Sequence, residues 1–528
     1  MPWVLLTWLF LFLLTVTEGQ AQDILSVTKD WTAPEYNQKI ASVGDLDISA
    51  MEFLLSYEFG PAFFKRSDQS KTKYLSVMIY EKLLALEGYR QGLDQNESVR
   101  LNCKAYAEDL MTEELFKEKI MSRINVSANE IDQAIPLEKQ HISLRWLYCN
   151  DKEQIDRRWQ KLNKGVSFDS LFAEQLGGTI AMSDRSLSTT RYDLSLKNPL
   201  LAAVVKNLPS GAFSAPIEVS DGWYIVKTEN IWTDLITTES EENKLRYELQ
   251  RSIFKQKLDR ASDIYVKNLM DEENPQIEKV TFAEVALYIN MRLADSLKYD
   301  QNLIAAKLGR ADHERIEATP SSDLGGHILV LGNSCRISFN DFIDWYRPRT
   351  AYIKFNSHSV EKFILAVQQT VWRMVRDFLL IEQARQIGLD KREAVIEQVK
   401  WWEEKFVFNA VKMQTAASIK FKENDLQTYY NENRSDYRDQ SGQILSFEKA
   451  RNNVQNDYLR EKYMNTLMHR VLALKKEYDV YINEDILKNI KVQEEENPLA
   501  IDLYTVKKGG LLPRQPYPTI DWEWQLWY

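Results

Sequence analysis

The residues that most often carry catalysis or bind metals are few in this chain and share no reactive spacing. There are five histidines and three cysteines in 528 residues, and Cys103, Cys149 and Cys335 lie far apart without a CxxC pair. Neither a zinc site nor a dense disulfide framework is indicated, and we expect buried free thiols, although one pair could oxidise in an exported protein. HExxH, a P-loop and a dinucleotide fingerprint are absent from the sequence. We therefore expect no metal and no cofactor.

Aromatic residues are the more informative side chains, with 14 Trp, 25 Tyr and 21 Phe. Pairs such as Trp401-Trp402 place rings on both sides of a predicted helix, whereas one buried stripe needs rings on one side only. We predict that some of these rings line a groove that binds extended polypeptides, with Trp345, Trp401 and Trp402 as candidates. Ordinary packing between helical modules is the alternative.

The composition is typical of a helical, multidomain globular protein. Hydrophobic residues make up 44% of the chain and charged residues 27%, with 14 Pro and 18 Gly, which is not the balance of a disordered chain. The length predicts roughly two to four compact units. A net charge of -10 argues against nucleic acid as the main partner.

The first residues predict export. The apolar run Trp3–Val16 is shorter than the roughly twenty residues that span a hydrocarbon core. Small residues at Gly19 and Ala21 suit cleavage of a signal peptide after Ala21. An uncleaved anchor is the alternative, because no Lys or Arg precedes the run. We expect no permanent membrane span after the signal is removed.

Helical patterning surrounds one strand-rich segment. Ser49 is placed as the N-cap of a helix, a long helix is expected over 97–122, and Ser127 to Glu130 has the spacing of a capping box. From Ile142 to Ile231 the pattern changes to short strands, one helix and Gly/Pro turns. Helical patterning returns after Thr238.

Part of the first helical segment recurs later in the chain. Four matches follow one another in the same order, namely Val43–Phe53 with Leu331–Phe342, Leu86–Asp94 with Ile381–Asp390, Glu108-Asp109 with Glu403-Glu404, and Ala128–Ile131 with Glu423–Leu426. We predict two copies of one helical module, of which only the first carries the strand-rich insert. A charged helix follows each copy, at 241–270 and 447–478, and we expect each to pack on its own module.

The insert carries a recognisable order of motifs. Ile142–Tyr148 reads as a first strand, Lys164–Ala173 as a helix-turn, Leu208–Pro216 as a Leu-x-x-Gly-x-x-Ser-x-Pro loop, and Asp221–Lys227 as a last strand. This order resembles the parvulin family of prolyl isomerases. With its helical flanks, the chain resembles SurA- and PrsA-like chaperones. The resemblance implies an α+β fold with two mostly helical modules and one inserted parvulin-like α/β domain, an antiparallel sheet with helices.

The chemistry departs from that family. Active parvulins carry paired histidines on the first and last strands, and the matching positions here hold Trp146 and Tyr224. The segment for the family's Cys or Asp is missing before Leu176, and the nearest alternative imidazole, His141, precedes the strand. Aromatic rings keep an apolar slot but remove groups that exchange protons, so we predict weak or absent isomerase activity and no confident catalytic residue. The predicted peptide-binding residues of the insert are Trp146, Leu200, Leu201, Phe213 and Tyr224.

The predicted organisation assigns every part of the chain. It comprises a signal peptide at 1–21, a first module at 22–140 plus 236–290, the parvulin-like domain at 141–235, a connector at 291–326, a second module at 327–490 and an aromatic tail at 491–528. The alternation in Trp522-Glu523-Trp524 suits an edge strand or a docking peptide.

The resemblance implies an ATP-independent periplasmic holdase. Its partners would be unfolded or extended client polypeptides, outer-membrane proteins among them, and not nucleic acid. Two alternatives stay open. The chain could be an active parvulin isomerase, or a structural subunit of an envelope assembly that docks through residues 513–528.

Overall fold

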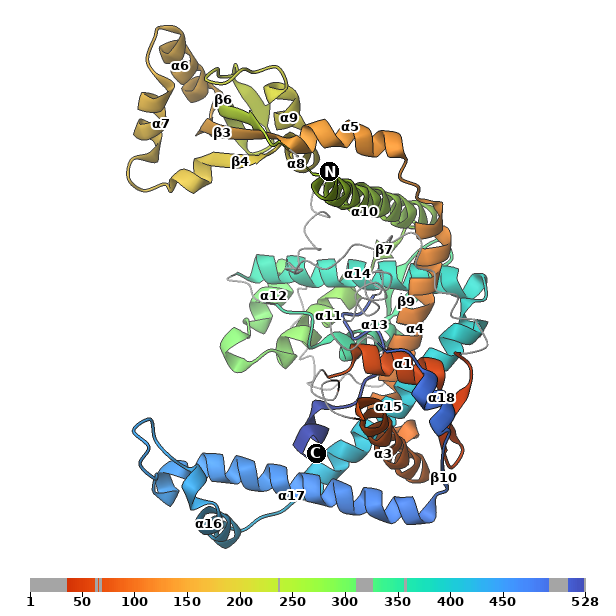
Figure 1. Cartoon of the computed structure of the whole chain (residues 1–528). Helices are drawn as coiled ribbons and strands as arrows, with labels where there is room; N and C mark the ends of the chain where they lie inside the picture. Colours follow the sequence, from red (N-terminus) through yellow and green to blue (C-terminus); the bar gives the residue numbers. More distant parts are fainter. Residues whose placement is uncertain are drawn as a thin grey trace. The chain divides into compact units, whose positions relative to one another are not determined.

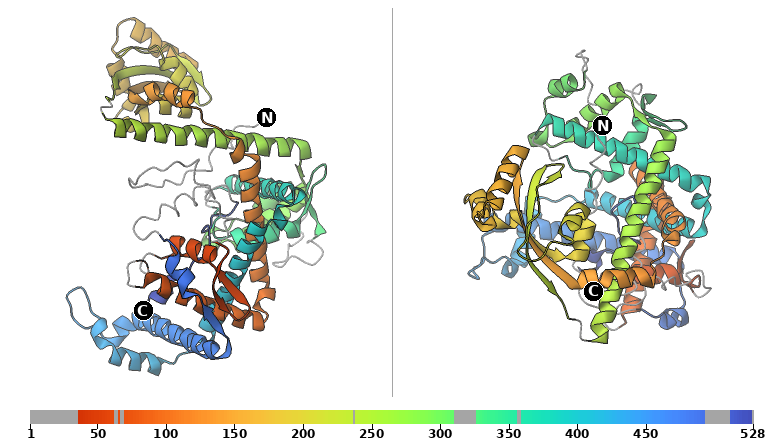
Figure 2. Two further views of the ribbon diagram at one scale, coloured as in Figure 1. Left: turned by 45° about the vertical axis from the view of Figure 1, so that its right-hand side comes forward. Right: turned by 90° about the horizontal axis from the view of Figure 1, so that it is seen from above.

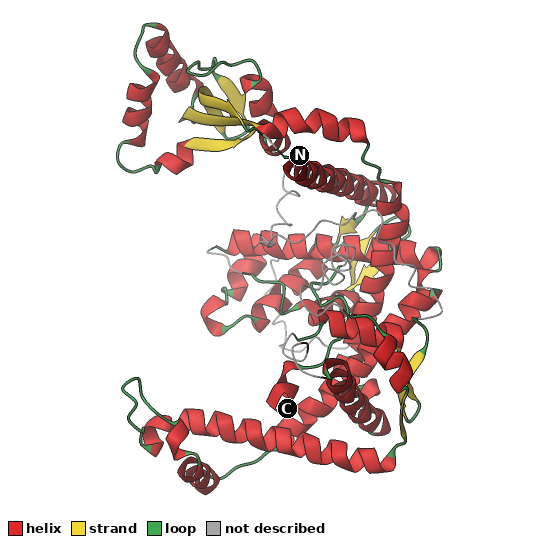
Figure 3. Cartoon of the chain, viewed as in Figure 1, coloured by secondary structure: helices red, strands yellow, loops and turns green. Residues whose placement is uncertain are grey.

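The structure is a computed structural model of the chain, and it describes residues 36–61, 65, 69–235, 238–309, 326–355, 359–492 and 511–526. The predicted signal peptide lies outside the described residues. The chain divides into two compact units (Figure 1). The sheet unit is Arg123–Ala261, and the helical unit combines Met1–Ser122 with Ser262–Tyr528. Helices and small antiparallel sheets build both units, which confirms the predicted α+β fold (Figure 3).

The helical elements follow one order twice. The first copy consists of β1 (Lys39–Val43), β2 (Leu46–Ser49), α1 (Ala50–Phe59), α3 (Ser70–Arg90), α4 (Glu97–Lys119), α5 (Ala128–Lys139), α10 (Glu239–Glu273) and β7 (Gln276–Ile277). The second consists of β8 (Ile328–Leu331), β9 (Arg336–Ser338), α13 (Phe339–Tyr346), α14 (Val360–Gln386), α15 (Glu393–Ser418), α16 (Glu423–Glu432), α17 (Phe447–Glu477) and β10 (Val480–Ile482). The internal repeat predicted from the sequence is confirmed.

Both copies begin their first helix with the same device. Ser49 Oγ accepts a hydrogen bond from the Glu52 amide at 3.1 Å, and Ser338 Oγ accepts one from the Asp341 amide at 3.2 Å. Each serine satisfies an amide that the first helical turn would leave unpaired. The capping box predicted at Ser127 is also present at the start of α5.

The two copies exchange their last elements. Strand β10 of the second copy pairs with β1 of the first, with Ala41 opposite Ile482, whereas β7 of the first copy pairs with β8 of the second, with Gln276 opposite Leu331. Helix α17 accordingly places Leu467 in the core that α3 builds. The expectation that each returning helix packs on its own module therefore holds for the first part of each helix, where α10 packs on α5 and α17 packs on α16. It is wrong for the last part of each helix, which enters the core of the other copy.

The end of α10 and the segment after it belong with the second copy. Leu269 and Met270 of α10 pack against the core around Phe342, and so does Ile289 of α11 (Lys279–Arg292). Residues 276–290, assigned to the first module from the sequence, thus fill the second core. Shorter connecting helices are α12 (Gln301–Lys307) and α18 (Glu484–Asn489).

The sheet unit is built on four antiparallel strands in the order β4-β3-β6-β5. The strands are β3 (Gln140–Cys149), β4 (Ser186–Thr190), β5 (Ile217–Val219) and β6 (Gly222–Thr233), and the helices between them are α6 (Lys152–Asn163), α7 (Phe168–Leu176), α8 (Arg191–Lys197) and α9 (Pro199–Val205). The sequence predicted one helix here, because helices of two or three turns give a weak periodic signal. Helices α5 and α10 lie side by side in this unit (Figure 2), where Ala134 packs with Leu249.

Strand β3 alternates between two apolar cores. Ile142 and Leu144 pack with Leu194 of α8, while Leu147 and Cys149 pack with α6 and α7. This alternation follows from the two-residue period of a strand whose two faces are both covered.

The cysteines differ in burial. All three are free thiols, of which Cys149 and Cys335 are buried as expected, whereas Cys103 is only half-buried. Within the described ranges, no helix is both long and apolar enough to cross a membrane.

Candidate peptide-binding sites

The sheet unit holds a cavity of about 500 Å3 beside β3. Trp146, Leu187, Leu194 and Leu201 line it with apolar side chains. The polar lining comes from His141, Ser188, Thr189, Thr190, Asp193, Lys197 and Asn198. Apolar walls with a few polar groups are typical of a site that binds an organic ligand or a peptide side chain.

Trp146 and Tyr224 project from one face of the sheet. In the antiparallel register Trp146 lies opposite Val226 and Tyr148 lies opposite Tyr224, and residues two apart on a strand share a face. Both side chains are half-buried and pack with Leu201 on the same apolar cluster. The structure thus brings together three of the residues predicted to bind peptides.

The Tyr224 hydroxyl is engaged in a local hydrogen bond. It donates to Asp221 Oδ2 at 2.6 Å, and its ring centroid lies 5.1 Å from that of Tyr148. Burial and the hydrogen bond to Asp221 raise the pKa of Tyr224, so the phenol stays protonated at neutral pH. The position therefore offers an aromatic surface and not a proton-exchanging group.

His141 lies at the start of β3, and its side chain contacts Asp234 and Trp232. Its Nε2 lies 2.6 Å from Asp234 Oδ2, and its ring stacks on Trp232 with an interplanar angle of 7°. His141 is nevertheless one of the residues that line the cavity beside β3. No group of three His, Cys, Asp or Glu side chains suited to a metal ion occurs in the described residues.

Two predicted residues of the insert lie apart from this cavity. Leu200 is 63% exposed on α9. Phe213 packs on the other face of the sheet, where its ring lies 5.9 Å from that of Trp159 and 6.3 Å from that of Phe168. A sequence motif gives the order of residues along the chain, but it does not show on which face of the sheet a loop residue such as Phe213 will pack.

Trp345 is half-buried in the second copy. Its Nε1 donates to Asp377 Oδ2 at 3.0 Å, and the guanidinium of Arg349 lies over its ring at 4.7 Å. These contacts anchor the ring within its own module.

Trp401 and Trp402 are buried on α15, and the C-terminal tail covers them. Trp401 packs with Tyr517, while Trp402 lies 4.6 Å from the ring of Tyr106 and 5.9 Å from the guanidinium of Arg514. The tail therefore packs on the helices of its own chain. Of the two alternatives, the edge strand is wrong for residues 511–526, where the last described element is a short 3-10 turn at Trp522–Leu526.

The tail places charged side chains opposite charges of the helices. Arg514 Nε donates to Asp109 Oδ2 at 2.5 Å, and Arg514 Nη2 donates to Glu113 Oε1 at 3.1 Å. The Arg514 and Asp109 side chains are 2% and 0% exposed. Further along, Asp521 pairs with Lys405 at 2.9 Å and with Lys412.

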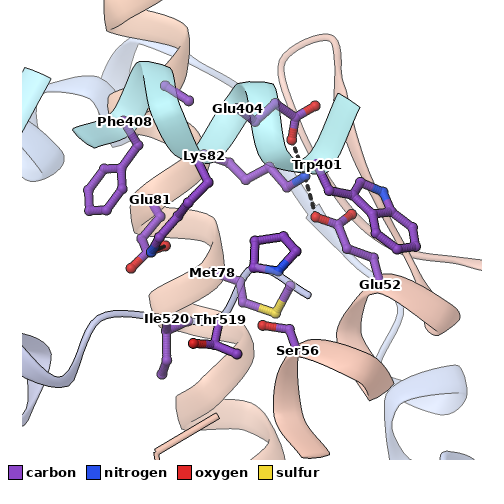
Figure 4. A pocket seen from close by; sticks show the side chains of 13 residues that line it. Glu52, Ser56, Met78, Glu81, Lys82, Trp401, Glu404, Phe408, Thr519 and Ile520 are labelled. Atoms are coloured by element: carbon purple, nitrogen blue, oxygen red, sulfur yellow. Dashed lines mark hydrogen bonds and ion pairs between the residues drawn. The ribbon is translucent and has the colours of Figure 1, made fainter. Parts of the chain in front are cut away.

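A small cavity of about 40 Å3 lies where the tail crosses α1, α3 and α15. Figure 4 shows Lys82 reaching between Glu52, whose Oε1 it contacts at 2.6 Å, and Glu404. Burial raises the pKa of Glu52 to about 7, an effect that Lys82 opposes and Glu404 adds to. Burial lowers the pKa of Lys82, but the two carboxylates raise it further, so the ammonium stays charged.

Sequence reasoning missed this buried cluster of Glu52, Lys82 and Glu404. A signal was present, because Glu52 interrupts the apolar run Met51–Leu55 and Lys82 precedes Leu83-Leu84-Ala85. A single charge within an apolar helical run indicates a buried partner elsewhere in the fold.

Comparisons with known proteins give structural likenesses alone. No family model and no curated protein matches the chain. The chain is similar to solved structures of the peptidylprolyl isomerase PrsA from Bacillus cereus, at 18% identity and a TM-score of 0.23 over 44% of this chain and 92% of that one. It is similar to PrsA from Bacillus anthracis, at 18% identity and a TM-score of 0.21 over 29% and 69%.

A third likeness is to the SurA-like chaperones PEB4 and Cj1289 of Campylobacter jejuni, at 14% identity and a TM-score of 0.22 over 46% of this chain and 99% of that one. At such TM-scores, the function proposed below has to stand on the chain's own residues.

Proposed function

We propose that the chain is an ATP-independent chaperone that holds unfolded, exported polypeptides and does not catalyse prolyl isomerisation. The observation that carries this proposal is the cavity of the sheet unit. Trp146 and Leu201 line it, and Tyr224 packs on the same cluster. It combines apolar surface with hydrogen-bonding groups, as a site for peptide side chains requires.

The same geometry argues against acid-base chemistry at this face. Proton transfer needs a group whose pKa lies near the working pH, within hydrogen-bonding reach of the reacting atom. Tyr224 has a raised pKa and donates to Asp221, and the indole of Trp146 does not titrate. The aromatic surface formed by Trp146 and Tyr224 therefore favours peptide binding over proton transfer.

Export and the class of client are part of the proposal. The apolar run at Trp3–Val16 supports secretion, and the net charge of -10 supports polypeptide over nucleic acid as the partner. We propose periplasmic clients that include outer-membrane proteins.

The test is suppression of aggregation of a urea-unfolded outer-membrane protein by the chain from Gln22 onward, without ATP. We expect protection near an equimolar ratio. Trp146→Ala should weaken protection several-fold, whereas Leu235→Ala, at a position 87% exposed and outside the cavity, should leave it unchanged. Absence of protection by the unaltered chain would contradict the proposal.

A prolyl-peptide isomerisation assay distinguishes the proposed holding chaperone from an active isomerase. A holding chaperone should give no rate above the uncatalysed reaction, whose barrier is roughly 18 to 20 kcal/mol. A rate that Tyr224→Phe or His141→Ala abolishes would favour the enzyme. A stable stoichiometric partner recovered with the chain would favour the subunit of an envelope assembly.

A further inference from the structure

The C-terminal tail fills a groove in the helical unit that offers separate sites for different side chains. Leu511 packs on the cluster around Trp402, and Tyr517 packs between α1 and Trp401. Ile520 and Trp524 enter the main core, where Trp524 is 2% exposed. The groove therefore accepts aromatic and aliphatic side chains from an extended segment.

Charge is graded along the groove. Its first end is acidic, because Asp109 and Glu113 receive Arg514. Its other end is basic on balance, because Lys405 and Lys412 receive Asp521, while Glu81 pairs with Lys405. This charge pattern favours one chain direction for a bound segment, in which a basic residue comes first, an aromatic residue second and an acidic residue third.

The helices hold the tail's backbone through side chains. The amides of Leu511 and Leu512 donate to Asp109 Oδ1, the latter at 2.9 Å, and the amide of Asp521 donates to Glu81 Oε1 at 2.9 Å. Prolines occupy positions 513, 516 and 518. Since proline has no amide to donate, a groove that binds through side chains tolerates sequences that could not join a β-ladder.

We propose that this groove is the client-binding groove of the helical unit and that the tail is a built-in competitor for it. The inference rests on the proposed chaperone function and adds the class of segment bound, an extended, proline-interrupted polypeptide that carries Arg or Lys, then Tyr, then Asp or Glu, then Trp. A client displaces the tail because both satisfy the same acidic, aromatic and basic sites. Trp401 and Trp402 then contact the client as they now contact the tail.

The first test compares two tryptophans of the tail in the full chain. Trp524 is 2% exposed and Trp522 is 58% exposed. With a fluorescein-labelled peptide of residues 511–526 as the probe, Trp524→Ala should lower the Kd at least tenfold relative to wild type, because its own tail competes less well. Trp522→Ala should bind the probe like wild type. A Trp524→Ala chain that keeps its circular dichroism but binds no tighter would overturn the proposal.

The second test uses the unaltered chain, so it does not depend on how a variant folds. Hydrogen exchange is measured with and without reduced, carboxymethylated lysozyme, a permanently unfolded polypeptide. Client binding should speed exchange over residues 511–524 at least tenfold and leave α11, which packs in the core around Phe342 away from the tail, unchanged. Bound client with unaltered tail exchange would overturn this inference but leave the proposed function intact. Failure of the client to bind at all would overturn both.

Discussion

Glu52 is the residue whose titration should be visible in stability. Its ordinary pKa is 4.5 and its pKa in the folded chain is about 7, with burial as the largest cause. The folded state therefore holds this proton more tightly than the unfolded state, and the free energy of unfolding falls as pH rises from about 4.5 to about 7. Glu52→Gln should remove this loss of stability. The free energy of unfolding of the variant, relative to that of wild type, should therefore rise by about 2 kcal/mol between pH 5 and 8.

The measurement is urea unfolding of both chains at several pH values. Ser56→Ala serves as the control, because Ser56 lines the same small cavity but does not titrate. Its effect on the free energy of unfolding should be independent of pH. A Glu52→Gln curve that runs parallel to wild type would show that Glu52 titrates as it does in the unfolded chain.

At the scale of single residues, the sequence predicts which side chains a site contains better than it predicts where the fold places them. The strand motifs lead to the expectation that Trp146 and Tyr224 stand where the parvulin family carries histidines, and the register places both on one face of the sheet. The same reading groups Phe213 with them, although the fold packs Phe213 against Trp159 on the other face. The partners of Lys82 come from α1 and α15, more than 300 residues apart in the chain, and no local pattern encodes that meeting.

At the scale of elements, helices α3 and α15 cross at Gly88. A Cβ atom there would lie 2.5 Å from Val407 Cγ1 and 3.3 Å from the Val407 carbonyl oxygen. Ala favours a helix by roughly 1 kcal/mol over Gly, but overpacking a close contact costs about 1–3 kcal/mol. We expect Gly88→Ala to lower the free energy of unfolding by about 1 kcal/mol in net terms.

Thr72→Ala is the matched control on the same helix, because Thr72 is exposed. It should change the free energy of unfolding by less than about 0.5 kcal/mol. Thermal and urea unfolding of the three chains measure the effect. A Gly88→Ala chain that is more stable than wild type would mean that α3 and α15 lie farther apart than the structure places them.

The type of each element can be predicted here because helix caps and periodicity are local features of the sequence. Which elements pack together cannot be predicted in this way. Ser49 and Ser127 mark helix starts in the sequence, and both caps are present. The amphipathic pattern of α17 states that one face is buried, but either copy of the module offers a matching apolar surface. Alternating Trp522 and Trp524 suggest a strand, yet a 3-10 turn that buries one ring and exposes the other gives the same pattern.

At the scale of the whole helical unit, the exchanged elements tie the two copies into one cooperative structure. The core of the first copy includes Leu467 of α17, which is 2% exposed, and β10 completes the sheet of β1 and β2. Neither copy can therefore lose its last helix without opening the other. Unfolding of the helical unit should be a single transition for probes placed in either copy.

Leu467→Ala tests this coupling, with Leu472→Ala, at a position 48% exposed on the same helix, as its control. Truncating a buried Leu typically costs about 2–5 kcal/mol. Because Leu467 packs on α3, the variant should lose hydrogen-exchange protection in α3 of the first copy as well as in α17, while Leu472→Ala keeps both. If each module were self-contained, α3 would keep its protection in Leu467→Ala and the loss would stay within residues 328–482. The distribution of the lost protection along the chain therefore decides between exchanged and separate modules.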